Sequence, residues 1–318
     1  MGFEMLAGND GLKSRLTAAL QTDRMTHSYL LSGPKGSGKH TLARLLAAAM
    51  ECTAESGRPC CSCRQCRKVL DGQHPDVVTV DDPEKKNVTV DAARTAKTDL
   101  YVRPNEGKRK IYVIPRAQDL NIPAQNALLK VMEEPPEYGV FLLLCERPEA
   151  LLPTVRSRCA ELTLSPVPEQ TAKAWLRREM PAAGEDVLHA AYLRSGGFLG
   201  QAKELLESGG EIDPHAAALL KACAEGDSLL LQQTLCKMEK WKRDQLVPVL
   251  RRMQAAAADA LAARNGFPAL SPEVGALSAG RTAAQLLRLY RVLQEAAEAA
   301  DANVGVGHIC GYLAVRLR

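Results

Sequence analysis

A glycine-rich loop between an apolar run and a helical pattern is the feature that most restricts how this sequence can fold. Residues 33–39 read GPKGSGK, which matches the pattern G-x-x-x-x-G-K. The loop follows the apolar run 28–32, which predicts a buried strand, and it precedes a helix predicted over 42–50. In that context backbone N–H groups, the helix N-terminus and the lysine form a phosphate site. The residues placed to contact nucleotide phosphates are Gly33, Gly36, Gly38, Lys39 and Thr41.

One position of this loop departs from the pattern. The residue after Lys39 normally carries the hydroxyl that binds Mg²⁺, and here it is His40. Thr41 lies one place later, about 100° around a helix axis, so it does not simply replace that hydroxyl. A glycine-rich turn that needs only positive φ is the simpler alternative. The fold of the loop is therefore expected, whereas the sequence leaves the binding of ATP or ADP open.

The surrounding segments alternate between strand and helix patterns, which predicts a parallel sheet covered on both faces. Further strands are expected at 75–80, 110–114 and 140–145, and helices at 8–23, 90–99 and 123–134. Beyond about residue 171 only helical patterns remain, at 171–180, 200–208, 215–224, 228–237, 244–264 and 282–301, with a final segment to 318. Pro248 is expected in about the first turn of its helix, where proline is tolerated.

Composition sets the class of protein and its compartment. The chain has 318 residues, a net charge of +4, 46% hydrophobic and 25% charged residues, which excludes a disordered or collagen-like chain. No apolar run approaches the roughly 18 residues that span a bilayer, and the start, with Glu4, does not resemble a signal peptide. We therefore expect a cytoplasmic protein without a membrane partner.

Five of the ten cysteines fall between residues 52 and 66, which indicates a metal site rather than disulfides in a reducing compartment. Cys52, Cys60, Cys63 and Cys66 have the spacing C-x7-C-x2-C-x2-C, and four thiolates at this density suit tetrahedral Zn²⁺. Cys61 is an alternative to Cys60, although the even spacing favours Cys60. Because no open coordination position or general base is evident nearby, we interpret the zinc as structural.

A family resemblance rests on four groups of residues. The segment 121–136 reads NIPAQNALLKVMEEPP, and 154–159 reads TVRSRC. Together with the glycine-rich loop and the four cysteines, these segments resemble bacterial clamp-loader subunits of the AAA+ class. The resemblance implies an AAA+ RecA-like parallel sheet domain over 1–166 with a zinc module at about 52–66, a small helical lid over 167–210 and an all-α collar bundle for oligomerisation over 211–318, with Gly209-Gly210 near the last boundary.

The family contains ATP-hydrolysing subunits, gamma/tau, and a companion, delta prime, and the resemblance can be tested at individual positions. Hydrolysing members carry a metal-binding Asp and a water-activating Glu after the strand 110–114, where this chain has Pro115 and Arg116. They also carry a lid arginine, and the matching position is Gly200. By contrast, Arg158 matches the family's arginine finger, which acts on a neighbour's nucleotide. The chain thus resembles delta prime, with no ATPase of its own.

The resemblance also implies partners. The chain would join gamma/tau and delta subunits in a five-membered ring of the DNA polymerase III holoenzyme, which places the sliding clamp on primed DNA. Two alternatives within the family are an ATP-hydrolysing gamma/tau-type subunit and a sensor that binds ATP without cleaving it. A stand-alone P-loop kinase or NTPase is the alternative of another class. A basic cluster at Arg103, Lys108, Arg109 and Lys110 is a weak candidate for direct DNA contact, and solvated loop charges are its simpler interpretation.

Overall fold

A computed structural model describes residues 2–81, 98–208, 214–269 and 271–317. The chain forms two compact units. Unit 1 comprises residues 1–175 and 196–201, and unit 2 comprises residues 176–195 and 202–318. Most of the helix predicted over 90–99 and the Gly209-Gly210 boundary lie outside the described residues.

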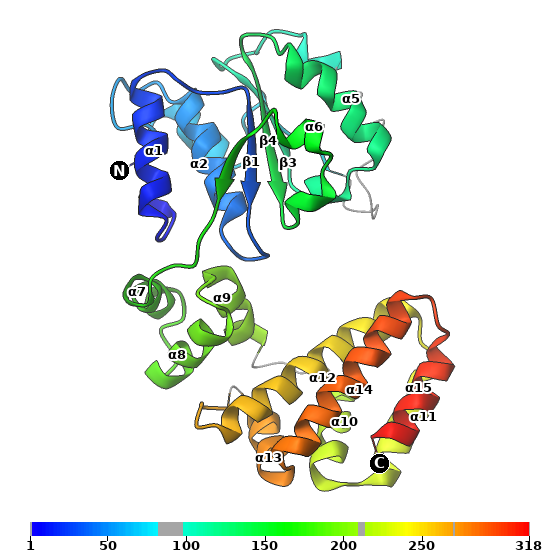
Figure 1. The fold of residues 1–318 in the computed structure, drawn as a ribbon. Coiled ribbons are helices and arrows are strands. Elements are labelled where there is room, and N and C mark those ends of the chain that lie inside the picture. The colour runs from blue at the N-terminus through cyan, green and yellow to red at the C-terminus, as the bar shows by residue number, and fades with distance from the viewer. Residues whose placement is uncertain (1, 82–97, 209–213, 270, 318) are drawn as a thin grey trace. The chain divides into compact units, whose positions relative to one another are not determined.

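Within its described part, unit 1 is built on a five-stranded sheet in which all neighbouring strands are parallel, in the order β2-β3-β4-β1-β5 (Figure 1). The strands are β1 (Ser28–Ser32), β2 (Val77–Thr79), β3 (Lys110–Ile114), β4 (Gly139–Cys145) and β5 (Ala160–Thr163). Strand β4 is buried along its whole length, as expected for a strand with helices over both faces.

Side chains that alternate along the strands form two separate cores. Leu31 and Leu142 belong to the core that contains residues of α1 (Asp10–Gln21) and α2 (Lys39–Glu51). Leu30 and Phe141 belong to the other core, with residues of α5 (Ile122–Glu133). Figure 1 shows α1 and α2 on one side of the sheet and α5 on the other. The sheet therefore fixes the position of the loop that follows β1, at the carboxyl end of that strand.

Unit 1 also contains short helices. They are α3 (Arg64–Leu70), α6 (Pro153–Arg156) and the 3₁₀ turns Gly2–Met5, Ala117–Asp119 and Pro148–Ala150. Three further helices follow, α7 (Glu169–Glu179), α8 (Glu185–Arg194) and α9 (Leu199–Ser208). Of these, α8 belongs to unit 2, and the division between the units falls within α7 and α9. Helix α5 begins where the Asn121 side chain accepts from the Ala124 N–H at 2.9 Å, and it ends before the Pro135-Pro136 pair.

The C-terminal part of unit 2 is a bundle with one hydrophobic core. Its described helices are α10 (Pro214–Glu225), α11 (Ser228–Met238), α12 (Arg243–Arg264), α13 (Pro272–Gly280), α14 (Ala283–Asp301) and α15 (Val306–Arg316). Buried alanines such as Ala257 and Ala296 let α12 and α14 pack along each other (Figure 1). Across the described ranges, no helix has both the length and the apolar character that a membrane span requires.

Several elements differ from the sequence-based expectation. Strand β5 and helices α3, α8 and α13 have no predicted counterpart, because each is short and carries a weak period. Pro248 lies inside α12 beyond the first turn, so the prediction of a first-turn proline is wrong. Because proline lacks an N–H, the carbonyl of Asp244 loses its regular helical donor there.

Candidate functional site

The four predicted metal ligands lie together in unit 1. The Sγ atoms of Cys52, Cys60, Cys63 and Cys66 are all within 4.8 Å of one another. In a tetrahedral site with Zn–S bonds of about 2.3 Å the sulfurs are separated by about 3.8 Å. The Sγ atoms of Cys60 and Cys66 are 4.0 Å apart, close to that separation. The residues present therefore fit a tetrahedral metal ion.

Backbone N–H groups favour the thiolate form of Cys60 and Cys63, which lowers their pKa, whereas burial raises the pKa of Cys52 and Cys66. The Cys63 N–H donates to Cys60 Sγ at 3.3 Å, and the Cys66 N–H donates to Cys63 Sγ at 3.4 Å. Burial raises the pKa of Cys63, but donors from Thr53 and Cys66 outweigh it and lower that pKa to about 6. A thiolate at neutral pH is the form that binds metal.

Cys61 points away from the cluster. Its φ is +57°, and its Sγ faces the carbonyl oxygens of Gly2 and Pro59 at 3.9 and 3.7 Å. The sequence left Cys60 and Cys61 as alternatives, and in the structure the thiol of Cys60 is the one beside the other three.

The glycine-rich loop follows β1 as predicted, and its lysine is bound by the loop itself. Gly36 and Gly38 have φ of 75° and 97°, in the region that glycine adopts without strain. Lys39 Nζ donates to the carbonyl oxygens of Gly33 and Pro34 at 2.7 and 2.9 Å. The Lys39 side chain is buried, and this burial lowers its pKa. Two of its three N–H donors are thus used inside the protein.

Residues at the start of α9 cover the loop. The Gly200 N–H donates to the carbonyl oxygen of Gly36 at 2.9 Å, and Gln201 Nε2 donates to that of Lys35 at 2.8 Å. A Cβ at position 200 would lie 2.6 Å from the Gly36 Cα, and a Cβ at position 36 would lie 2.5 Å from the Gln201 nitrogen. The two backbones are so close that neither glycine can carry a side chain without a shift.

An internal ion pair occupies the position after β3 where hydrolysing relatives are expected to carry acids. Arg116 donates to Asp81 Oδ1 through Nη2 at 2.6 Å and through Nε at 3.1 Å. Asp81, Pro115 and His40 line one cavity of about 320 Å³. Asp81, the carboxylate that lines this cavity beside Pro115, is therefore already paired with a guanidinium.

Arg158 lies on the surface just after α6. Its Nη2 is 2.5 Å from a Glu133 carboxylate oxygen, and its Nη1 donates to the Thr154 carbonyl at 2.9 Å. About a third of the side chain is exposed, 34%, so the guanidinium is held in place yet reachable from outside. Arg156 is also exposed.

The basic cluster is divided by the structure. Lys110 is buried in β3, where its Nζ lies 2.9 Å from Asp99 Oδ1, so it faces no external phosphate. Arg109 donates from Nη1 to the Glu137 carbonyl. Lys108 and Arg103 remain exposed in the loop before β3. Lys110 is therefore neither a DNA-facing nor a solvated loop charge, whereas Arg103 and Lys108 are solvated loop charges, as the simpler interpretation expects.

Sequence reasoning missed two buried carboxylates that organise this loop. Asp76 accepts from the backbone N–H groups of Asn105, Glu106 and Gly107 at 2.6, 2.9 and 2.8 Å. Glu51 accepts from the next two backbone N–H groups, at residues 108 and 109, at 2.7 and 2.9 Å. Five successive amides thus surround two carboxylates. We call residues 105–109 the clamped loop.

The clamped loop joins the cysteine cluster to the sheet. Glu51 is the last residue of α2, directly before the first predicted metal ligand, and Asp76 directly precedes β2. Gln65 and Lys68 of α3 contact Glu106, through its carbonyl and its carboxylate. No local pattern indicates these bonds, because the partners are separated by about 30 to 60 residues in sequence.

Comparisons with known proteins agree with this architecture. The family model described as DNA polymerase III, delta subunit, matches residues 8–168, half of the chain. DNA polymerase III subunit delta' of Escherichia coli K12 is 34% identical over 225 residues, which cover 70% of this chain and 62% of the relative. Subunit gamma/tau of Mycobacterium bovis is 30% identical over 199 residues, 61% of this chain and 34% of the relative.

Among solved structures, a gamma-subunit-related protein of Thermotoga maritima has a TM-score of 0.53 at 19% identity, over 95% of this chain and 99% of that one. This likeness shows the fold. The chain spans about one third to two thirds of the length of the two curated relatives described above. The chain therefore belongs to the DNA polymerase III delta-subunit family and is a clamp-loader protein of the AAA+ class.

Proposed function

We propose that this chain is a delta-prime-type subunit that hydrolyses no ATP itself and supplies Arg158 to the ATP site of a neighbouring subunit. In this proposal it joins gamma/tau and delta subunits in a hetero-pentamer that loads the sliding clamp on primed DNA. The AAA+ domain over 1–166, the lid over 167–210 and the collar over 211–318 are part of the same proposal.

The observation that carries the proposal is the state of the chain's own nucleotide loop. Lys39 donates to two carbonyls of the loop, so a phosphate would have to displace those bonds. Gly200 stands where hydrolysing relatives are expected to carry the lid arginine, and any side chain there would meet Gly36. Arg116, at the position expected for the water-activating acid, is paired with Asp81. Each observation concerns a different part of the hydrolysis machinery and supports a subunit that does not hydrolyse ATP.

The exposure of Arg158 supports the second half of the proposal. A finger supplied to a neighbouring site must be reachable, and it works best when its orientation is fixed beforehand. The Glu133 and Thr154 contacts fix the guanidinium at the surface. When the neighbour's nucleotide approaches, its phosphate charge would compete with Glu133 for the same group. In other systems such a finger accelerates hydrolysis by roughly 10³–10⁵-fold.

We further propose that the four-cysteine cluster holds a structural Zn²⁺ through Cys52, Cys60, Cys63 and Cys66. Zinc in a closed thiolate site contributes to folding free energy and needs no open coordination position. The cluster and the clamped loop are fastened to each other through α3, so the ion would stabilise both.

The proposed function is tested with Arg158→Ala in a complex reconstituted with gamma/tau and delta subunits. We expect normal assembly and a clear fall in DNA-stimulated ATP hydrolysis. Arg156→Ala is the matched control, because it removes an exposed arginine two residues away and should leave the rate unchanged. Equal ATPase rates for the Arg158 variant and the wild type would refute the finger assignment.

The ATP-hydrolysing alternative is favoured by one observation, the 30% identity to a gamma/tau subunit over 199 residues. The purified chain alone distinguishes the two functions. A delta-prime-type subunit should show no ATP turnover above a Lys39→Ala variant. Turnover by the isolated chain that this variant abolishes would establish the gamma/tau type instead.

A further inference from the structure

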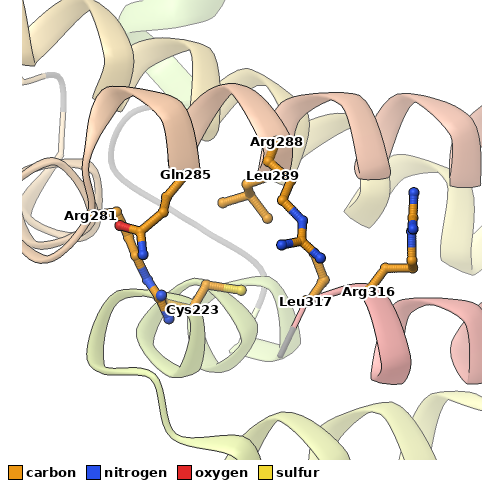
Figure 2. A pocket seen from close by; sticks show the side chains of 7 residues that line it. All are labelled: Cys223, Arg281, Gln285, Arg288, Leu289, Arg316 and Leu317. Atoms are coloured by element: carbon orange, nitrogen blue, oxygen red, sulfur yellow. The ribbon is translucent and has the colours of Figure 1, made fainter.

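A small pocket in the C-terminal bundle carries positive charge that the proposed function does not use. It lies between α14 and the C-terminal ends of α10 and α15, and its volume is about 90 Å³ (Figure 2). Its walls consist of three arginines, one glutamine, one cysteine and two leucines. We call it the arginine pocket. Figure 2 shows Arg281 and Arg288 extending from α14 and the residues before it, and Arg316 extending from α15.

No acidic side chain lines the arginine pocket. Arg281 donates from Nε to the carbonyl oxygen of Cys223, a neutral acceptor. The Arg316 guanidinium lies 5.8 Å from the centroid of the Tyr312 ring. Over the ranges that the structure describes, Arg288 makes no hydrogen bond or ion pair. Three arginines thus line one cavity, two of them, Arg288 and Arg316, exposed to solvent, and no carboxylate among the lining residues offsets their charge, so an anion is attracted to it.

The remaining walls suit a small oxygen anion on an apolar stem. Gln285 Oε1 accepts from the Thr282 N–H at 2.9 Å, which leaves the Nε2 donors of Gln285 for the pocket. Cys223 is buried, and burial raises the pKa of its thiol to about 11, so it carries no negative charge at neutral pH. Leu289 and Leu317 complete the lining with apolar atoms.

We propose that the arginine pocket binds the carboxylate of an acidic side chain presented by another polypeptide. A guanidinium matches a carboxylate through two parallel N–H donors, and arginine is the residue that makes this pairing most strongly. The narrow cavity accepts one head group, and its apolar wall accepts the methylene stem of a glutamate. The phosphates of duplex DNA form continuous rows, which a single cavity of about 90 Å³ does not follow.

The test uses the full-length chain alone, so it does not depend on the clamp-loader role. Arginine Nε–Hε resonances of ¹⁵N-labelled protein are followed while N-acetylglutamate is added at constant ionic strength. We expect saturable shifts for Arg281, Arg288 and Arg316. N-acetylglutamine, which has the same shape without the charge, should produce none. Shifts that are absent, or equal for the two compounds, would overturn the proposal.

Two variants of α14 separate the pocket from general charge attraction. Arg288→Gln should weaken N-acetylglutamate binding about tenfold or more, because one charge-assisted pair is lost. Arg291→Gln removes the same charge from an exposed position outside the pocket and should leave binding unchanged. Equal weakening by both variants would contradict a specific site. A short DNA duplex that shifts the same resonances at lower concentration than N-acetylglutamate would replace the polypeptide partner with a nucleic acid.

Discussion

Replacing Asp76 by asparagine should destabilise unit 1 by about 2–4 kcal/mol, although the side chain keeps its shape. The Asp76 carboxylate is fully buried and accepts four hydrogen bonds, three from backbone N–H groups and one from Asn105 Nδ2. Each carboxylate oxygen of Asp76 accepts two of these hydrogen bonds. In asparagine one oxygen is replaced by an NH₂ group, so in either orientation of the amide two donors lose their acceptor. Each buried donor without an acceptor costs about 1–3 kcal/mol, and the partial exposure of the clamped loop favours the lower half of the sum.

Hydrogen–deuterium exchange measures this loss in the full-length chain. The slowest amides of β3 and β4 report the opening of unit 1, and the amides of residues 105–107 report the clamped loop itself. Asp71→Asn is the matched control, because Asp71 is exposed at the end of α3 and should change stability by less than about 0.5 kcal/mol. If the two variants exchange alike at β3 and β4, the buried carboxylate does not stabilise unit 1 as reasoned.

The pH dependence of this difference has a definite sign. Burial raises the pKa of Asp76, but the N–H donors of Asn105, Glu106 and Gly107 outweigh it and hold the pKa below its ordinary value of 3.8. The stability that Asp76 supplies is thus present above that value and is lost as pH falls through the lower folded-state pKa. The difference between the wild type and Asp76→Asn should be present above about pH 5 and should close below about pH 4. A difference that does not shrink below pH 4 would contradict the assignment.

Three further changes test other parts of the chain. Cys63→Ser should lose the zinc ion measured per chain by atomic absorption and should lower the melting temperature, whereas Cys61→Ser should retain the metal; loss from both variants would show that the ligand set is wrong. Gly200→Ala should accelerate amide exchange in the nucleotide loop, because the added Cβ clashes with backbone and destabilises the contact by about 1–3 kcal/mol. Gly11→Ala adds a Cβ into open space and should leave exchange in the loop unchanged. Equal exchange rates in the two variants would refute the close contact. Pro248→Ala should raise the stability of unit 2 by about 1–3 kcal/mol, since it restores a backbone donor at an exposed helix position, and an unchanged urea midpoint would contradict this.

Local patterns determined the elements whose signal is strong and contiguous. The apolar runs at 28–32, 110–114 and 140–145 became β1, β3 and β4, because a strand buried on both faces needs an uninterrupted apolar run. The glycine-rich turn likewise adopts positive φ angles at Gly36 and Gly38, which glycine accepts without strain. Shorter elements such as β5 were missed, since four residues carry too little periodicity to separate strand from loop.

The sequence by itself determined which residue types are available to each site, and therefore that the acids expected after β3 are replaced by Pro115 and Arg116 and that four thiols fall within fifteen positions. Only the tertiary structure decided which atoms meet. It placed Cys60 rather than Cys61 beside the other thiols, paired Arg116 with Asp81, and directed Glu51 into the clamped loop. These pairings join residues far apart in the chain or depend on the path of a single turn, and such contacts arise from packing and hydrogen-bond satisfaction in three dimensions rather than from any local period.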